Sequence, residues 1–255
     1  MTPDLPAPFL DIPLAHRAYH DIAAGRPENS RAAILAAIDA GYGIEIDLQM
    51  SADGQAMVFH DYGLSRLTRE TGAVRQRSAQ SLGAIPLIGA DETIPTLPEI
   101  LDLVAGRVPV LLELKDQDGA MGRDVGPLER ATAEAVAGYA GPVAVMSFNP
   151  HSVAALAEYA PDVPRGLTTS AYDPTDWPLS AAICAQLRDI PDFDRVGAAF
   201  ISHEVTDLDR KRVMDLRAAG VPVLTWTVTS LDQAEDVAGY CDNITFEGFA
   251  APWRT

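Results

Sequence analysis

The stretch IEIDLQ, residues 44–49, alternates apolar and polar side chains and is the most informative part of the chain. Successive side chains of a β-strand point to opposite faces, so the apolar residues share one face while Glu45, Asp47 and Gln49 share the other. Two carboxylates on a buried face repel each other and destabilise the fold unless a cation compensates them. An edge strand with both acids in water is disfavoured, because the alternate face is apolar and β-branched. We therefore predict a buried strand whose polar face binds a hard divalent cation, Mg²⁺ or Ca²⁺.

The stretch VLLELK, residues 110–115, repeats this alternation. Glu113 and Lys115 share one face of the predicted strand with Leu111, and the other apolar residues share the opposite face. Two interpretations of the pair are about equal on this strand alone: a buried salt bridge that only supports the fold, or part of a functional site. The recurrence of the pattern on a neighbouring strand favours one shared site.

Short apolar runs alternate with Ala-rich helical stretches along most of the chain, which is typical of βαβ units and a parallel sheet. The predicted strands are Phe9–Ala15, Gly43–Gln49, Val108–Leu114, Val143–Ser147, Arg165–Thr169, Ala198–Ser202, Val221–Thr227 and Asn243–Phe246. The predicted helices include Ser30–Ala40, Pro98–Ala105, Pro127–Tyr139, Pro150–Tyr159, Ser180–Arg188, Asp207–Ala219 and Ser230–Ala238. This series predicts one α/β domain, a closed (β/α)₈ TIM barrel, for which 255 residues are sufficient. A doubly wound open sheet is the runner-up, but no Gly-rich phosphate loop follows the first strand.

Several residues are expected to define the ends of helices. Asn29 is a candidate N-cap for the first helix, because its side chain can accept a hydrogen bond from the first turn. Gly41, Gly220 and Gly239 follow predicted helices at positions where a left-handed residue commonly ends a helix.

Residues 61–93 interrupt the regular alternation of strands and helices. This segment has no clear periodicity and is rich in Arg, Ser, Thr and Gly. A gap of this length predicts a small insertion after the second barrel strand, at about residues 61–91, lying over the barrel mouth. It contains a basic cluster, which we interpret as a solvated loop with salt bridges rather than a surface that attracts anions: Arg66, Arg69, Arg75 and Arg77.

The acidic composition limits the class of partner. The formal net charge is −17, which argues against a nucleic-acid partner, because phosphate backbones attract basic surfaces. No apolar run approaches the ~20 residues of a membrane span. The first residues lack the basic and apolar regions of a signal peptide, so we expect a cytoplasmic protein. Cys184 and Cys241 lie far apart without metal-ligand spacing, and we interpret them as buried, reduced thiols.

Two histidines are placed where a barrel has its active site. His16 follows the first predicted strand and precedes Arg17, and His60 ends a short apolar run. Active sites of TIM barrels lie at the C-terminal ends of the strands. Imidazole titrates near neutral pH, so two histidines can act as general acid and general base. Together with Arg17, Lys115 and the carboxylates, they indicate a catalytic site rather than isolated structural residues.

A series of short motifs occurs in order between residues 14 and 116. They are His16-Arg17, Glu28-Asn29-Ser30, Glu45-Ile46-Asp47, Ser51-Ala52-Asp53-Gly54, Val58-Phe59-His60-Asp61, Leu64-x-Arg66-x-Thr68 with Gly72, Ile94-Pro95-Thr96-Leu97 and Glu113-Leu114-Lys115. In this order they resemble the glycerophosphodiester phosphodiesterase family. Beyond residue 116 the resemblance thins to residues 147–150 and 225–227. Ala18 departs from the Gly that the family usually has, and Glu247 departs from the Asp that often ends its last strand.

The resemblance implies one divalent cation, Mg²⁺ or Ca²⁺, that polarises a phosphate oxygen. Its ligands would be Glu45, Asp47 and Glu113. Arg17 and Lys115 would bind other phosphate oxygens, and the planar fork of an arginine suits that role.

The resemblance also implies that His16 and His60 form the acid–base pair. One would deprotonate the attacking hydroxyl and the other would protonate the leaving alcohol, and which does which is left open. The products would be glycerol 3-phosphate and an alcohol. Trp226 is interpreted either as an apolar wall for the substrate or as ordinary packing. Glu247 has either an acidic role at the mouth or a structural one, and His20 has no assigned role.

Three alternatives fit the sequence less well than a small-diester hydrolase. A lysophospholipase-D-like phosphodiesterase would need an apolar groove for an acyl chain, and the insertion is not notably apolar. A metal-dependent sugar isomerase or aldolase would not need both histidine motifs with an Arg–Lys phosphate clamp. A barrel that binds phosphodiesters without turnover would be expected to lack a metal ligand or a histidine, and all are present. The head group and the oligomeric state are not predicted.

Overall fold

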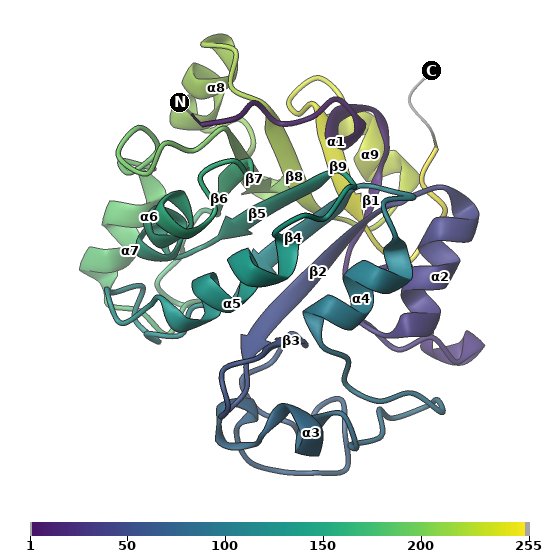
Figure 1. The fold of residues 1–255 in the computed structure, drawn as a ribbon. Helices are drawn as coiled ribbons and strands as arrows, with labels where there is room; N and C mark the ends of the chain where they lie inside the picture. Colours follow the sequence, from purple (N-terminus) through teal and green to yellow (C-terminus); the bar gives the residue numbers. More distant parts are fainter. Residues whose placement is uncertain (1, 253–255) are drawn as a thin grey trace.

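The computed structural model describes residues 2–252, which form a closed barrel of eight parallel strands (Figure 1). The strands are β1 (Leu14–Ala15), β2 (Gly43–Met50), β4 (Val110–Leu114), β5 (Val143–Ser147), β6 (Arg165–Thr169), β7 (Phe200–Glu204), β8 (Val223–Val228) and β9 (Asn243–Phe246). The barrel closes because β1 pairs in parallel with both β2 and β9. The predicted (β/α)₈ TIM barrel is confirmed.

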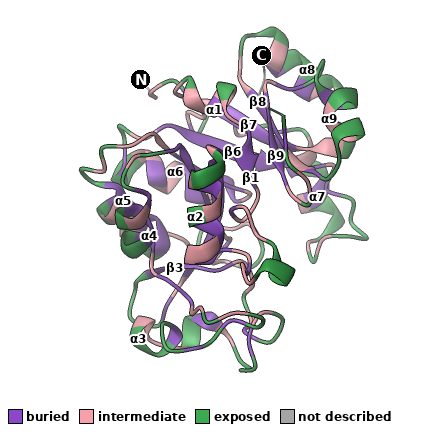
Figure 2. Cartoon of the chain, turned by 90° about the vertical axis from the view of Figure 1, so that its right-hand side faces the viewer, coloured by how far each residue is buried: buried purple, intermediate pink, exposed green. Residues whose placement is uncertain are grey.

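Most of the helices surround the barrel, with their outer surfaces exposed and the strands buried inside them (Figure 2). The helices of residues 2–252 are α1 (Pro8–Asp11), α2 (Arg31–Ala40), α3 (Ala79–Leu82), α4 (Leu97–Val104), α5 (Pro127–Val136), α6 (Pro150–Tyr159), α7 (Ala181–Arg188), α8 (Lys211–Ala218) and α9 (Leu231–Val237). Helix α6 has the predicted bounds. Helix α8 starts later than predicted, because Val205–Asp207 form a separate 3₁₀ turn.

The side chains of each strand point alternately outward and into the barrel, so the apolar residues form two layers. Ile44, Ile46 and Leu48 pack outward in a large cluster with residues of the surrounding helices, as their spacing predicted. A second cluster, containing Leu111 and Phe200, fills the barrel interior. The polar residues of β2 therefore share the interior face.

The first predicted strand is wrong over most of its length. Pro8–Asp11 form α1, and only Leu14 and Ala15 pair with neighbouring strands. Phe9 is fully buried and belongs to the cluster inside the barrel. The apolar character of this segment therefore reflects its packing into the barrel interior rather than a long strand.

Two of the predicted helix ends are also wrong. Ser30, not Asn29, is the N-cap of α2, and its side chain accepts a hydrogen bond from the Ala33 N–H. Gly41 and Gly220 adopt the expected left-handed conformation, with φ of 76° and 87°. Helix α9 ends at Val237, before Gly239, and Gly239 is not left-handed.

The segment that follows β2 leaves the barrel and returns to it. Strand β3 (Ala56–Val58) pairs antiparallel with β2, so the chain turns back at residues 51–55. The following residues have an apolar core of their own, which includes Phe59, Leu64 and Leu82. This segment lies beyond the C-terminal end of β2, at the bottom of the view in Figure 1.

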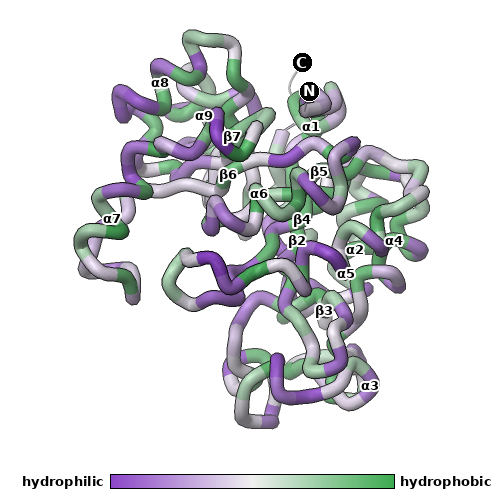
Figure 3. The backbone as a smooth tube through the Cα atoms, turned by 60° about the vertical axis from the view of Figure 1, so that its left-hand side comes forward, coloured by the Kyte–Doolittle hydropathy of each residue, from purple (hydrophilic) through white to green (hydrophobic). Residues whose placement is uncertain are grey.

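The hydropathy of the residues differs between the buried strands and the outer helices. Strand β4 is largely hydrophobic, whereas α8 contains strongly hydrophilic stretches (Figure 3). Within residues 2–252, no helix has the length and apolar character needed to cross a membrane.

Candidate active site

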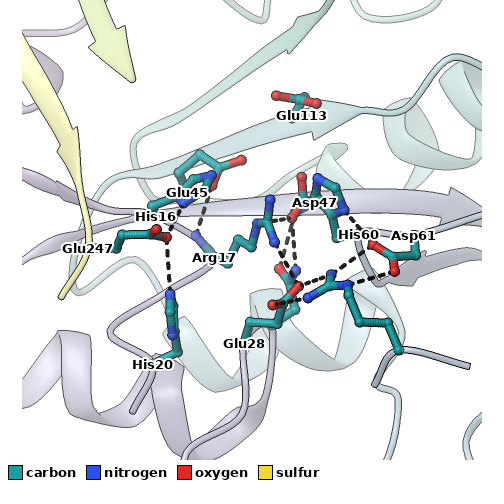
Figure 4. Close-up of polar contacts among 12 residues, drawn as sticks. His16, Arg17, His20, Glu28, Glu45, Asp47, His60, Asp61, Glu113 and Glu247 are labelled. Carbon is teal, nitrogen blue, oxygen red and sulfur yellow. Dashed lines mark hydrogen bonds and ion pairs between the residues drawn. The ribbon is translucent and has the colours of Figure 1, made fainter. Parts of the chain in front are cut away.

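The C-terminal ends of β1, β2 and β4 bring together the charged residues that the sequence singled out (Figure 4). Glu45 and Asp47 lie two residues apart on β2, so both point to the barrel interior. Asp47 is the direct neighbour of Glu113 in the parallel pairing of β2 with β4. The three carboxylates each offer an oxygen within 4.8 Å of the others. All three side chains are buried.

Lys115 lies against this acidic cluster. Its Nζ is 2.7 Å from Asp47 Oδ1 and donates a short hydrogen bond to Glu113 Oε1. Burial lowers the pKa of Lys115, but the charges of Asp47 and Glu113 outweigh it and raise the pKa above its ordinary value. The salt bridge that was one interpretation of the Glu113–Lys115 pair therefore exists, and it also includes Asp47.

The carboxylates carry more negative charge than Lys115 compensates. Burial and the charges of Asp47 and Glu113 raise the pKa of Glu45 well above its usual range. Burial also tends to raise the pKa of Asp47. The charges of Lys115 and the other nearby cations outweigh this effect, so the pKa of Asp47 lies below its ordinary value. Three buried carboxylate oxygens at this spacing suit a hard divalent cation, which would relieve their repulsion.

His16 is held by a carboxylate from the other end of the chain. Its Nδ1 is 2.6 Å from Glu247 Oε2, although 231 residues separate the two. His20 Nε2 lies 3.4 Å from the same oxygen. Hydrogen bonds from His16 and His20 lower the pKa of Glu247 below its usual range, against the opposite effect of burial. Glu247 therefore remains ionised. Because its contact with His16 uses Nδ1, the Nε2 atom of that ring is left for another partner.

His60 has a comparable carboxylate partner next to it in the chain. Its Nδ1 is 2.7 Å from Asp61 Oδ1. Burial and the positive charge of Lys115 lower the pKa of His60, although Asp47 and Asp61 oppose the shift. The apolar run that precedes His60 forms β3, which is antiparallel to β2 and not a strand of the barrel. Strand β3 returns to the level of Asp47, where the Phe59 N–H donates to the Asp47 carbonyl.

Arg17 connects the first loop to the acidic cluster. Its backbone N–H donates to Glu45 Oε2 at 2.9 Å, and its Nη1 donates to Glu28 Oε1 at 3.0 Å. Arg17 and Ala18 both have positive φ, 51° and 64°, a conformation that costs L-residues roughly 1–2 kcal/mol each. The loop thus keeps its left-handed turn at Ala18 without a glycine.

Three residues near the centre had no predicted role in the active site: Glu28, Asn29 and Arg66. Asn29 is buried, and its Nδ2 donates to Asp47 Oδ2 at 2.8 Å while its Oδ1 accepts from the Asp47 N–H. Glu28 accepts hydrogen bonds from both Arg17 and Arg66. All three occur in the ordered motifs, but their roles depend on contacts between segments that local spacing does not indicate.

Trp226 lies in an aromatic cluster on the other side of the barrel. Its ring centroid is 5.5 Å from that of Phe148, which also contacts Tyr172 and Trp177. Its Nε1 donates to the Ser202 carbonyl at 3.0 Å. Both the packing and the wall interpretation of Trp226 are compatible with this arrangement, because its side chain is only partly buried.

Comparisons with known proteins agree with this arrangement. The model of the glycerophosphoryl diester phosphodiesterase family matches residues 16–242. The protein YhdW of Bacillus subtilis is 28% identical over 85% of this chain and 86% of its own length. A glycerophosphodiester phosphodiesterase of Caldanaerobacter subterraneus is 30% identical over 55% of this chain and 60% of its own. A phosphodiesterase of Oleispira antarctica, solved with the product sn-glycerol-3-phosphate, superposes with a TM-score of 0.75 at 24% identity, covering 92% of this chain and 93% of that one.

Proposed function

This chain belongs to the glycerophosphoryl diester phosphodiesterase family, and from that premise we propose that it hydrolyses small glycerophosphodiesters to glycerol 3-phosphate and an alcohol. The observation that carries the proposal is the convergence of two carboxylate-paired histidines on one buried acidic cluster. The presence of sn-glycerol-3-phosphate as product in the Oleispira antarctica structure supports the choice of substrate class.

The acidic cluster would hold one divalent cation, Mg²⁺ or Ca²⁺, through Glu45, Asp47 and Glu113. When bound, such an ion supplies Lewis-acid polarisation of a phosphate oxygen. The cluster suits it because its carboxylates are buried and only partly compensated by Lys115.

Arg17 and Lys115 would bind the remaining phosphate oxygens. An ammonium group has three N–H donors, so Lys115 can keep its contacts with Asp47 and Glu113 and still donate to the substrate. The Arg17 guanidinium is fixed at Nη1 by Glu28, and its Nε faces Asp47 at 3.7 Å, so the Nη2 N–H groups are left for phosphate.

His16 and His60 would move the protons. Each has its Nδ1 against a carboxylate, which orients the ring and stabilises the protonated form, so each presents Nε2 to the substrate. We assign the general base to His60, because burial and Lys115 lower its pKa and favour the neutral ring that accepts a proton. His16 would then protonate the leaving alcohol.

A second candidate, lysophospholipase-D-like action, draws on the aromatic cluster around Phe148. That cluster offers an apolar surface, which the insertion did not suggest. The cavity bordered by Phe148 and Tyr172 beside this cluster has a volume of about 10 Å³, so that cavity could not hold an acyl chain. The small, water-soluble diester stays the first candidate, and the assay below includes both substrates.

The test is release of glycerol 3-phosphate from glycerophosphocholine and glycerophosphoethanolamine, with chelator and with added Mg²⁺ or Ca²⁺. The parent protein should act only with an added ion, and His16→Ala and Glu45→Ala should each lose at least ~100-fold in kcat/KM. Lysophosphatidylcholine, tested in parallel, should not be cleaved. No product from the parent with either ion would overturn the proposal.

A further inference from the structure

Arg66 makes contacts that a solvated loop residue does not need. Its Nε and Nη2 donate to the two oxygens of Asp61, both at 2.7 Å. Its Nη1 and Nη2 donate to the two oxygens of Glu28 at 2.8 and 2.7 Å. One guanidinium thus forms two bidentate pairs, which is the geometry that fixes a carboxylate most strictly.

Each of these carboxylates also holds a residue of the proposed active site. Asp61 Oδ1 is 2.7 Å from His60 Nδ1. Glu28 Oε1 accepts from Arg17 Nη1 at 3.0 Å. A continuous chain of charge-assisted hydrogen bonds therefore runs from His60 to Arg17, with Arg66 at its centre. Figure 4 shows this chain between the labelled Asp61 and Glu28.

The electrostatics of the two carboxylates depend on Arg66. Burial raises the pKa of Asp61, but the hydrogen bonds from Arg66 and His60 outweigh it and bring the pKa to about 2. Burial likewise opposes the ionisation of Glu28, and the hydrogen bond and charge of Arg66, with the charge of Arg17, lower its pKa. Without Arg66, the two negative charges would face each other across the junction of two loops.

We propose that Arg66 is a positioning residue for the reaction proposed above. By fixing Asp61 and Glu28 together, it holds the His60 imidazole and the Arg17 guanidinium in one geometry relative to the phosphate. The inference rests on the proposed function and extends it, because it makes the insertion part of the catalytic apparatus. Arg66 acts through its neighbours, so its loss should reduce kcat more than it raises KM.

A purely structural role is the rival explanation. Arg66 has 45% of its side chain exposed, and exposed ion pairs contribute roughly 0–1 kcal/mol to stability. Arg77 offers a matched control in the same insertion. Its Nη2 donates to Glu70 Oε2 at 2.9 Å, its side chain is 31% exposed, and no contact joins it to His60 or Arg17 within the described residues.

The experiment compares Arg66→Gln and Arg77→Gln in the full chain, with glycerophosphocholine and the activating ion. We expect both variants to melt within a few degrees of the parent. Arg66→Gln should lose about 10- to 100-fold in kcat with a smaller change in KM, whereas Arg77→Gln should stay within about 2-fold. Arg66→Lys should recover only part of the loss, because an ammonium group restores the positive charge but cannot form the two bidentate pairs with Asp61 and Glu28.

A double-mutant cycle tests whether Arg66 acts through Asp61. If it does, Arg66→Gln should cost less than about 3-fold in kcat when added to Asp61→Asn. Equal losses in both backgrounds, or an Arg66→Gln variant as active as Arg77→Gln, would overturn the inference while the proposed function stands. An inactive parent would instead overturn the proposed function, and the role of Arg66 with it.

Discussion

The two halves of the barrel mouth differ in chemistry. The half formed by β1, β2 and β4 carries the acidic cluster, its cations and both histidines. The half formed by β5 to β8 presents an aromatic cluster that includes Phe148 and Trp226. Buried charges need partners of opposite sign close by, so they concentrate in one dense network. An aromatic surface needs only packing, and it can shape the opposite side of the mouth without taking part in proton transfer.

Glu247 joins the charged half from a strand that belongs to neither group. It directly follows β9, and its carboxylate contacts His16. The contact is made where β9 pairs with β1 and the barrel closes. The comparison therefore predicts large effects from the acidic cluster, intermediate effects from Glu247 and small effects from the aromatic half.

The largest effect is expected for Asp47→Asn, at the centre of the charged half. It should lower kcat/KM on the order of 10³-fold, because it removes a carboxylate from the cation site and a partner of Lys115. We expect Mg²⁺ or Ca²⁺ to raise the melting temperature of the parent, since an ion that binds only the native state must stabilise it, and Asp47→Asn should remove that rise. Thermal unfolding with and without the ion measures this.

The matched control for Asp47→Asn is Asp39→Asn, which removes the same charge from an exposed position on α2. It should keep both the activity and the response to the ion. If the melting temperature of Asp47→Asn still rises with the ion as the parent's does, the cation binds elsewhere. That result would contradict the assignment of the cation to the charged half.

An intermediate effect is expected for Glu247→Gln. Without the carboxylate, the protonated form of His16 loses its partner, so kcat should fall about 10- to 100-fold. His20→Gln is the control, because His20 lies farther from the same oxygen, at 3.4 Å, and it should change kcat less than about 3-fold. If the two variants lose equally, His20 takes part in the chemistry as well.

Glu247 also makes a prediction for stability against pH, which the same variant tests. Its pKa is lowered in the folded protein by hydrogen bonds from His16 and His20, so its ionised form stabilises the fold above the unfolded value of about 4.3. That contribution is lost as the pH falls toward the folded pKa. The difference in melting temperature between the parent and Glu247→Gln should thus be largest near pH 6 and shrink by pH 3.

The smallest effect is expected in the aromatic half. Trp226→Leu removes a ring that stacks edge-on against Phe148 and should raise KM about 3- to 10-fold, with kcat changed less than about 2-fold. Trp177→Leu, in the same cluster, reports the effect of loosening the packing alone. A fall in kcat as large as that of Glu247→Gln would show that the aromatic half takes part in the chemistry.

The sequence predicted the charged half much better than its surroundings. Glu45 and Asp47 share a face because strand side chains alternate, and this is a local property that six residues display. The ordered motifs around His16 and His60 lie in the first half of the chain, where the family resemblance is dense. The aromatic cluster was less visible, because its rings come from separate loops and strands of the second half.

By itself, then, the sequence determined which residues alternate, where most of the barrel strands and the helices between them form, and which carboxylates share a buried face, because short-range geometry sets these features. The tertiary structure decided which distant groups meet. Closure of the barrel places Glu247 against His16, and the return of β3 brings His60 level with Asp47. The contacts of Arg66 with Glu28 and Asp61 depend equally on how segments far apart in the chain pack together. The local spacing of residues does not predict that packing.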